Sequence, residues 1–279
     1  MRVADAICEA AQRLSKTSDT ARLDAEVLMA HALGMPRSEM LLRHLDESAP
    51  ERFASWVERR SEHEPIAYIV GQQEFFGRPF KVSRDTLIPR ADSETVVEAA
   101  LEALSRIEAR GVLDLGTGTG ALLLTLLAER PDLEGVGIDK CEAALRVARA
   151  NAAALDIGDR ARFLHRAWSG PVGEGGQSWF SDLGPCDFII ANPPYVEERA
   201  KLDPSVRAFE PRDALFAGPD GLDDYRVLIP AIAEMGCRAA VLEIGCAQAE
   251  PVSELAEKAG FRVALRRDLA NRPRALVLS

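Results

Sequence analysis

Two short segments of this chain combine residue types that can hold a small ligand and act on it. The first, "LDLGTGTGA" at 113–121, places three glycines between an apolar run and a helical pattern. Glycine tolerates a positive φ and has no Cβ, so this turn lets the backbone approach a ligand at the N-terminus of a helix. The residues of the predicted ligand-binding turn are Gly116, Thr117, Gly118, Thr119 and Gly120.

The spacing of these glycines narrows the class of ligand. G-x-G-x-G is not the dinucleotide fingerprint G-x-G-x-x-G, and no Lys-Ser/Thr pair follows as in a P-loop. The next predicted strand ends in Asp139, whose carboxylate can accept both hydroxyls of a ribose. This carboxylate is compatible with an adenosyl ligand, but it does not distinguish S-adenosyl-L-methionine from NAD. The form D-L-G-T-G-T-G resembles motif I of the Rossmann-like methyltransferases, and this resemblance implies S-adenosyl-L-methionine as the cofactor.

The second segment, "DFIIANPPY" at 187–195, ends an apolar run with two prolines. Beside a methyl donor it favours a planar nitrogen as the acceptor, because the delocalised lone pair of such a nitrogen must be aimed by holding both N–H groups. The Asn192 side-chain oxygen and the Pro193 carbonyl can each accept one N–H bond. Pro193 and Pro194 fix φ in advance, and Tyr195 can cover the flat face of the acceptor. We therefore predict Asn192, Pro193, Pro194 and Tyr195 as catalytic and substrate-binding residues.

Trp168 is a further candidate for the cofactor site. It follows the apolar run "RARFLHRA", and its indole offers a wide face for stacking on adenine. The alternative is a half-buried packing residue, since tryptophans are usually well buried. Many methyltransferases of this class carry an acid just before this point, which would hold the adenine amino group. Here that position is Ala167, so the sequence predicts no such contact.

The elements that must position these residues follow from the apolar patterns. From Val3 to about His63 the spacing predicts four helices, and "EFFGRPFKVS" at 74–83 predicts a hairpin around Gly77-Arg78. Beyond Ala91, helical patterns alternate with short apolar runs, which predicts a doubly wound α/β fold with its ligand beyond the carboxyl ends of the strands. The seven runs are 111–115, 134–139, 160–165, 186–191, 238–244, 261–267 and 274–279.

Further motifs extend over nearly the whole chain. They include "EPIAYIVGQQEFFG" at 64–77, "TLIPRADSE" at 86–94 and "FEPRDALFAGPDGL" at 209–222. Together with the glycine and proline turns, in this order, they resemble the protein glutamine methyltransferases that modify the Gly-Gly-Gln loop of peptide chain release factors. Two departures from that pattern are "ADSE" at 91–94, where a proline and a threonine are usual at the first and third positions, and "NRP" at 271–273.

The resemblance implies a domain plan and a set of roles. It implies a helical substrate-recognition domain over 1–72, a β-hairpin linker over 73–90 and a Rossmann-like, seven-stranded methyltransferase domain over 91–279. The helical domain would recognise the release factor, and Ile88, Pro89 and Arg90 would line the same cleft as the two turns. The residues implied to contact the cofactor are Gly116 to Gly120, Asp139, Trp168 and Asn192, and those implied to hold the glutamine are Asn192 to Tyr195.

The charge and composition of the chain bear on two alternative functions. Adenine-specific DNA or RNA methyltransferases use a related proline turn, but 34 basic against 44 acidic residues give a net charge of −10, which opposes a phosphate backbone. A non-catalytic adenosyl-binding scaffold would not need Asn192 and Tyr195. No direct nucleic-acid or membrane partner is expected, and the chain is expected to be cytoplasmic, since no stretch reaches the roughly 18 apolar residues of a membrane span.

Two minor features predict no additional chemistry. The five cysteines are widely spaced without a C-x-x-C pair, and the sulfonium of the cofactor already carries the positive charge, so no metal is predicted. The triplet Gly175-Gly176-Gln177 mimics the substrate motif implied by the resemblance. Glycine-rich loops supply such triplets readily, and we interpret this one as a coincidence rather than a site of self-methylation.

Overall fold

The computed structural model describes residues 1–168, 180, 183 and 186–279. The Gly175–Gln177 triplet lies outside these described residues. The chain divides into two compact units. The smaller contains Met1–Gln72 and Leu202–Phe209, and the larger contains Gln73–Lys201 and Glu210–Ser279. The segment predicted as a linker, 73–90, therefore groups with the larger unit, and the short segment 202–209 groups with the smaller one.

The smaller unit is helical. The four helices predicted before His63 are confirmed, and the next segment forms a fifth short helix that the sequence pattern did not indicate. These are α1 (Val3–Leu14), α2 (Ala21–Leu33), α3 (Arg37–Arg43), α4 (Arg52–Ser61) and α5 (Ile66–Val70), and α9 (Pro204–Phe209) belongs to the same unit. Its core includes the fully buried Ile7, Leu28, Met29 and Met40. Asp24 is also buried there and pairs with Arg60 at 2.7 Å.

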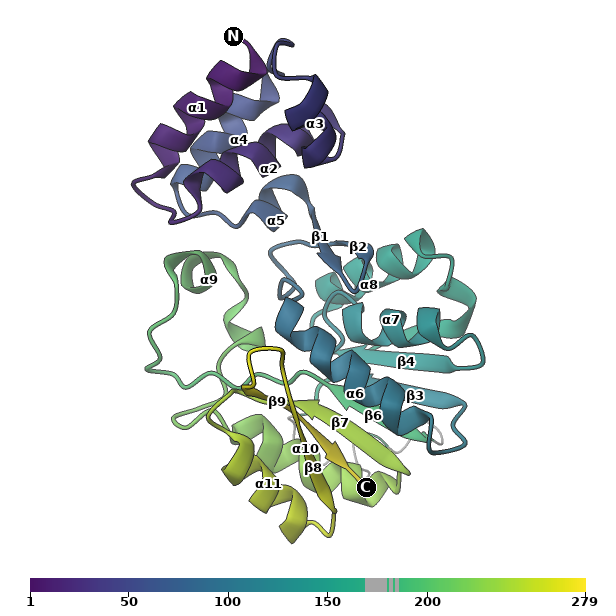
Figure 1. The fold of residues 1–279 in the computed structure, drawn as a ribbon. Coiled ribbons are helices and arrows are strands. Elements are labelled where there is room, and N and C mark those ends of the chain that lie inside the picture. The colour runs from purple at the N-terminus through teal and green to yellow at the C-terminus, as the bar shows by residue number, and fades with distance from the viewer. Residues whose placement is uncertain (169–179, 181–182, 184–185) are drawn as a thin grey trace. The chain divides into compact units, whose positions relative to one another are not determined.

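A seven-stranded sheet forms the centre of the larger unit, in the order β5-β4-β3-β6-β7-β9-β8 (Figure 1). The five strands from β5 to β7 are parallel, whereas β9 runs antiparallel to both β7 and β8. All seven predicted strands are confirmed. They are β3 (Gly111–Leu115), β4 (Glu134–Asp139), β5 (Ala161–His165), β6 (Phe188–Ala191), β7 (Ala239–Glu243), β8 (Val263–Arg267) and β9 (Pro273–Leu278).

Helices cover both faces of this sheet, which explains why its central strands are apolar without alternation. In β6, Phe188 and Ile190 pack into the core under α6, α7 and α8, while Ile189 and Ala191 pack into the core under α10 and α11. The bounds of these helices are α6 (Glu94–Leu104), α7 (Ala121–Glu129), α8 (Glu142–Ala154), α10 (Asp223–Met235) and α11 (Ala249–Lys258). The doubly wound α/β architecture is confirmed.

The predicted hairpin is confirmed with a small shift. Its strands are β1 (Gln72–Phe75) and β2 (Arg78–Lys81), so the turn lies at Phe76–Gly77, one residue earlier than predicted. Both turn residues have positive φ, 50° and 73°, the combination that suits a two-residue hairpin. The described residues of the larger unit also form three short 3-10 turns: η1 (Ala91–Ser93), η2 (Gly158–Arg160) and η3 (Arg212–Ala214). No helix among the described residues is long and apolar enough to cross a membrane.

Candidate functional site

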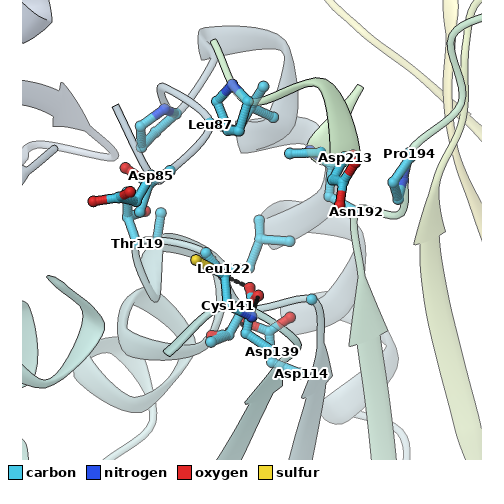
Figure 2. A pocket seen from close by; sticks show the side chains of 18 of the residues that line it. Asp85, Leu87, Asp114, Thr119, Leu122, Asp139, Cys141, Asn192, Pro194 and Asp213 are labelled. Atoms are coloured by element: carbon cyan, nitrogen blue, oxygen red, sulfur yellow. Dashed lines mark hydrogen bonds between the residues drawn. The ribbon is translucent and has the colours of Figure 1, made fainter. Parts of the chain in front are cut away.

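A cavity of about 530 Å³ lies at the carboxyl ends of β3, β4 and β6 in the larger unit (Figure 2). This is the edge at which an open α/β sheet binds its ligand. Eight of the eleven predicted site residues line the cavity: Gly116, Thr117, Gly118, Thr119, Asp139, Trp168, Asn192 and Pro194. Gly120, Pro193 and Tyr195 are adjacent in the chain but are not part of the lining.

The glycine turn connects β3 to α7 and needs glycine at specific points. Gly116, Gly118 and Gly120 have φ of 78°, 54° and 81°, a region that costs other residues roughly 1–2 kcal/mol each. A Cβ on Gly116 would lie 2.7 Å from Cη2 of Trp168, whereas a Cβ on Gly118 would meet no heavy atom within 4 Å. The backbone at Gly118 therefore faces open space, as the close approach of a ligand requires.

Asp139, at the end of β4, organises this turn. Its Oδ2 accepts a bond from the Gly118 amide at 2.9 Å, and its Oδ1 accepts one from the Cys141 amide at 2.8 Å. A carboxylate has about four acceptor positions, so each oxygen retains one for a further donor. The side chain can thus fix the turn and still accept two hydroxyl groups of a ligand in the cavity.

Asp114 is a site residue that the sequence analysis missed. It lies on β3, is 1% exposed, and accepts a bond from Thr117 Oγ1 on Oδ2 at 2.6 Å. Its Oδ1 has no hydrogen-bond partner among the described residues. Burial, together with the charge of Asp139, raises the pKa of Asp114 to about 7, although the bond from Thr117 acts in the opposite direction. A carboxyl group within an otherwise apolar, doubly covered strand is itself a signal, since such residues are rarely buried without a role or a partner.

Trp168 is fixed in a definite orientation. Its Nε1 donates to Asp224 Oδ1 on α10 at 2.7 Å, and its six-membered ring lies against Gly116. Burial raises the pKa of Asp224, although the bond from Trp168 acts in the opposite direction. The indole is half-buried and also contributes to the lining of the cavity. It therefore combines the two roles that the sequence left open, as a packing residue and as a wall of the site.

The proline turn enters the cavity from the end of β6. Asn192 and Pro194 line it, and Figure 2 shows both on the opposite side of the cavity from Thr119. Among the described residues the Asn192 carboxamide has no hydrogen-bond partner, so its oxygen is free to accept one. Pro193 is buried behind the turn. The Tyr195 hydroxyl donates to Glu243 Oε1 at 3.4 Å, and its ring packs with the core under α10 and α11.

Two motif segments form another wall. The buried Glu210 accepts a bond from the Ile88 amide at 3.2 Å and pairs with the guanidinium of Arg90. This links the "LIPR" segment to the "FEPRDA" segment. Ile88 is buried rather than exposed to the cavity. The lining residues from these two segments are Leu87, Pro89, Arg90, Pro211, Arg212, Asp213 and Ala214, and the residues just before the first segment add Arg84, Asp85 and Thr86.

Comparisons with known proteins agree with this architecture. The families described as "PrmC N-terminal domain" and "Methyltransferase small domain" match residues 5–71 and 93–210. The release factor glutamine methyltransferase of Cereibacter sphaeroides is 42% identical over 98% of this chain and 97% of that protein. The protein of the same name from Caulobacter vibrioides is 38% identical over 93% of this chain and 89% of its own length.

A solved structure extends the likeness to the fold. The hMettl16 catalytic domain in complex with the MAT2A 3′UTR hairpin 6 superposes with a TM-score of 0.55 at 16% identity, covering 82% of each chain. At that identity the likeness concerns the arrangement of strands and helices alone. It is consistent with the methyltransferase fold built around the cavity described above.

Proposed function

Because this chain belongs to the release factor glutamine methyltransferase family, we propose that it transfers the methyl group of S-adenosyl-L-methionine to the side-chain amide nitrogen of the glutamine in the Gly-Gly-Gln motif of peptide chain release factors. The observation that carries the proposal is the position of Asn192. Its carboxamide, which has no hydrogen-bond partner in the described part of the chain, lines the same cavity as the glycine turn, where it can hold an acceptor amide against a donor.

The described residues fit the proposed cofactor. A cavity of about 530 Å³ is within the usual range for a small-molecule site. Asp139 would accept the ribose hydroxyls, Trp168 would lie against the adenine, and the open backbone at Gly118 would allow close approach. Oδ1 of the buried Asp114, to which no described residue donates a hydrogen bond, offers an acceptor for a cationic group. When bound, the cofactor supplies an activated methyl group on a positively charged sulfur.

The chain's own residues would hold and orient the acceptor. The oxygen of Asn192 and the carbonyl of Pro193 would each accept one N–H of the glutamine amide, which directs its nitrogen across the cavity. A neutral carboxamide suits this task, because it accepts a hydrogen bond without removing the proton. Pro193 and Pro194 would keep these acceptors in a fixed direction. Tyr195 completes the turn and would shield it from water.

Protein rather than nucleic acid is the substrate that the charges favour. The net charge of −10 opposes binding to a phosphate backbone. Cationic residues around the cavity are also engaged: Arg90 pairs with Glu210, Lys140 lies 3.1 Å from Asp213, and Arg212 covers the ring of Phe216 at 4.7 Å. We propose that the smaller unit binds the body of the release factor and that the reaction takes place in the cytoplasm, where translation ends.

One assay tests the proposal. Purified protein is incubated with S-adenosyl-L-methionine and a release factor, and the glutamine-containing peptide is examined by mass spectrometry for one added methyl group. A release factor with Gln→Ala in the motif and an adenine-containing DNA serve as controls. We expect transfer to the intact release factor only. Asn192→Ala should reduce transfer at least roughly 1,000-fold, with unchanged melting temperature. Methylation of the DNA but not of the release factor would overturn the proposal.

A further inference from the structure

Three loops of the larger unit converge on the side chain of Gln248. Its Nε2 donates to the carbonyl oxygen of Tyr195 at 3.0 Å and to that of Gly221 at 3.1 Å. Its Oε1 accepts a bond from the Gly245 amide at 3.0 Å. Gln248 itself stands immediately before α11. One carboxamide therefore joins the proline turn after β6, the loop before α10 and the loop after β7.

The surrounding backbone leaves room for this carboxamide and for little else. A Cβ on Gly221 would collide with the carbonyl oxygen of Tyr195 and would lie 2.7 Å from Nε2 of Gln248. A Cβ on Gly245 would lie 2.7 Å from Oε1 of Gln248 and 3.4 Å from Cδ2 of Tyr195. Gly221 also has φ of 71°. Glycine at both positions is thus a condition for the bridge, which indicates that these loops are shaped around it.

Tyr195 is held on its side-chain end as well. Its hydroxyl donates to Glu243 Oε1, and its ring packs with the core under α10 and α11. Beyond it, the Val196 amide donates to the Leu215 carbonyl at 2.8 Å, and the Val196 carbonyl accepts from Ala217 at 3.0 Å. The residue that ends the proline turn is therefore anchored in the interior of the unit, while Asn192 and Pro194 line the cavity.

We propose that Gln248 is a positioning residue for the methyl transfer: by holding the Tyr195 carbonyl it fixes the far end of the proline turn and so the direction of the Asn192 carboxamide. The near end is fixed by pairing within the sheet at Ala191. Between the two ends, φ is locked at both prolines, so a displacement at Tyr195 is passed to Asn192 rather than absorbed. The expected effect of Gln248 on methyl transfer rests on the proposed function, whereas the anchoring of the proline turn by Gln248 does not.

Gln248→Glu tests this inference with almost no change in shape. The carboxylate loses both N–H donors and faces two carbonyl oxygens, so the turn is released. We expect kcat on the release factor to fall roughly 100-fold, the effect of about 1 Å of misplacement. The KM for the release factor and the affinity for S-adenosyl-L-methionine should stay unchanged, because the remote contacts and the glycine turn are intact. Asn271→Asp makes the same amide-to-acid change at an exposed position of the larger unit. It is the matched control and should retain the wild-type kcat.

Hydrogen exchange gives a second readout that does not need catalysis. The amides of Val196 and Glu198 are hydrogen-bonded, to Leu215 and Gly218 respectively, and should exchange at least about tenfold faster in Gln248→Glu than in the wild type or the control. If Gln248→Glu does not fold, the uncharged variant Gln248→Met replaces it, and the same two quantities are measured: kcat on the release factor and amide exchange in 192–198. A folded variant with wild-type kcat, or with unchanged exchange in 192–198, would overturn the inference. A wild type that does not methylate the release factor would instead refute the proposed function and leave the exchange result to decide the anchoring.

Discussion

The glycine turn after β3 and the proline turn after β6 face the same cavity but are built in opposite ways. Each is held by one carboxamide from elsewhere in the chain. Asn151 on α8 donates to the carbonyls of Thr119 and Lys81 at 2.9 and 3.0 Å and accepts from the Lys81 amide at 2.7 Å, as Gln248 does for the proline turn. The glycine turn, however, presents bare backbone at Gly118, whereas the proline turn lines the cavity with the side chains of Asn192 and Pro194. We propose that the glycine turn acts by letting the cofactor approach the backbone closely, and that the proline turn acts by holding its acceptor groups in one direction.

A buried carboxylic acid stands behind each turn. Asp114 and Glu243 are each 1% exposed, each accepts one hydroxyl bond, and each has one oxygen without a partner among the described residues. Burial raises the pKa of both to about 7. Ser93 lies close enough to lower the pKa of Glu243, although its hydroxyl is outside hydrogen-bonding geometry. Of these two acids, Asp114 lines the cavity and Glu243 does not, so the charge of Asp114 is the one that would lie next to a bound ligand.

The largest effect on stability is expected from Asn151→Asp. The residue is 1% exposed, and the change replaces two N–H donors by a charged oxygen that faces two carbonyls. We expect the free energy of unfolding to fall by about 3–5 kcal/mol, because a buried charge is left without a partner. Chemical denaturation measures this. Asn271→Asp, at an exposed position, is the control and should change little; equal losses would contradict the role given to Asn151.

Two glycine substitutions separate backbone strain from packing in the glycine turn. Gly116→Ala combines a positive φ with a contact of 2.7 Å to Trp168, so we expect a loss of about 2–3 kcal/mol in unfolding free energy. Gly118→Ala meets open space and should cost only about 1 kcal/mol. Its new methyl group would nevertheless obstruct the cofactor. Denaturation and calorimetric titration of both variants should therefore rank them in opposite orders, and the same order in both measurements would argue against ligand approach at Gly118.

How much of this site the sequence could predict depends on the range of the contacts. The two turns and the seven strands appear as local patterns in the sequence, and these patterns were sufficient to predict them. Asp114 was available as an acid in a buried strand and was missed. Asn151 and Gln248 could not be found in this way, because the carbonyls to which they donate are 27 to 70 residues away. Nothing in a single sequence indicates that a glutamine before a helix joins distant loops. The antiparallel direction of β9 is likewise decided by the pairing, not by its apolar run.

The two acids give a pH test of the difference between the turns. A carboxyl group whose pKa is raised on folding stabilises the protein fully below its unfolded pKa, and that stability is lost as pH rises through the folded value. For Asp114 and Glu243 the loss occurs between about 4 and about 7. Asp114→Asn and Glu243→Gln cannot ionise, so the stability of each should rise relative to the wild type by about 2–3 kcal/mol between about pH 5 and about pH 8.

Affinity for the cofactor should then distinguish the two variants. Asp114→Asn removes a negative charge from the lining of the cavity and should weaken binding of the positively charged S-adenosyl-L-methionine, most clearly above about pH 7, where the wild-type acid is ionised. Glu243→Gln should leave that affinity unchanged. Titration calorimetry at two pH values makes the measurement. Equal affinity losses in both variants would mean that the acids do not differ in function as their positions indicate.

The smallest effect on stability, and the one that bears most directly on direction, is expected from Pro193→Ala. Alanine can adopt the same φ, so the unfolding free energy should fall by only about 0.4–1 kcal/mol, through the greater freedom of the unfolded chain. Pro131→Ala, in an exposed turn far along the sheet from the cavity, should cost the same. If the prolines merely end β6, both variants should methylate equally well. If they preset the acceptors, Pro193→Ala alone should lower kcat, by roughly tenfold, because the turn then samples directions that Gln248 can limit only from its far end. A kcat equal to that of Pro131→Ala would show that direction at this turn is set by its anchors and not by its prolines.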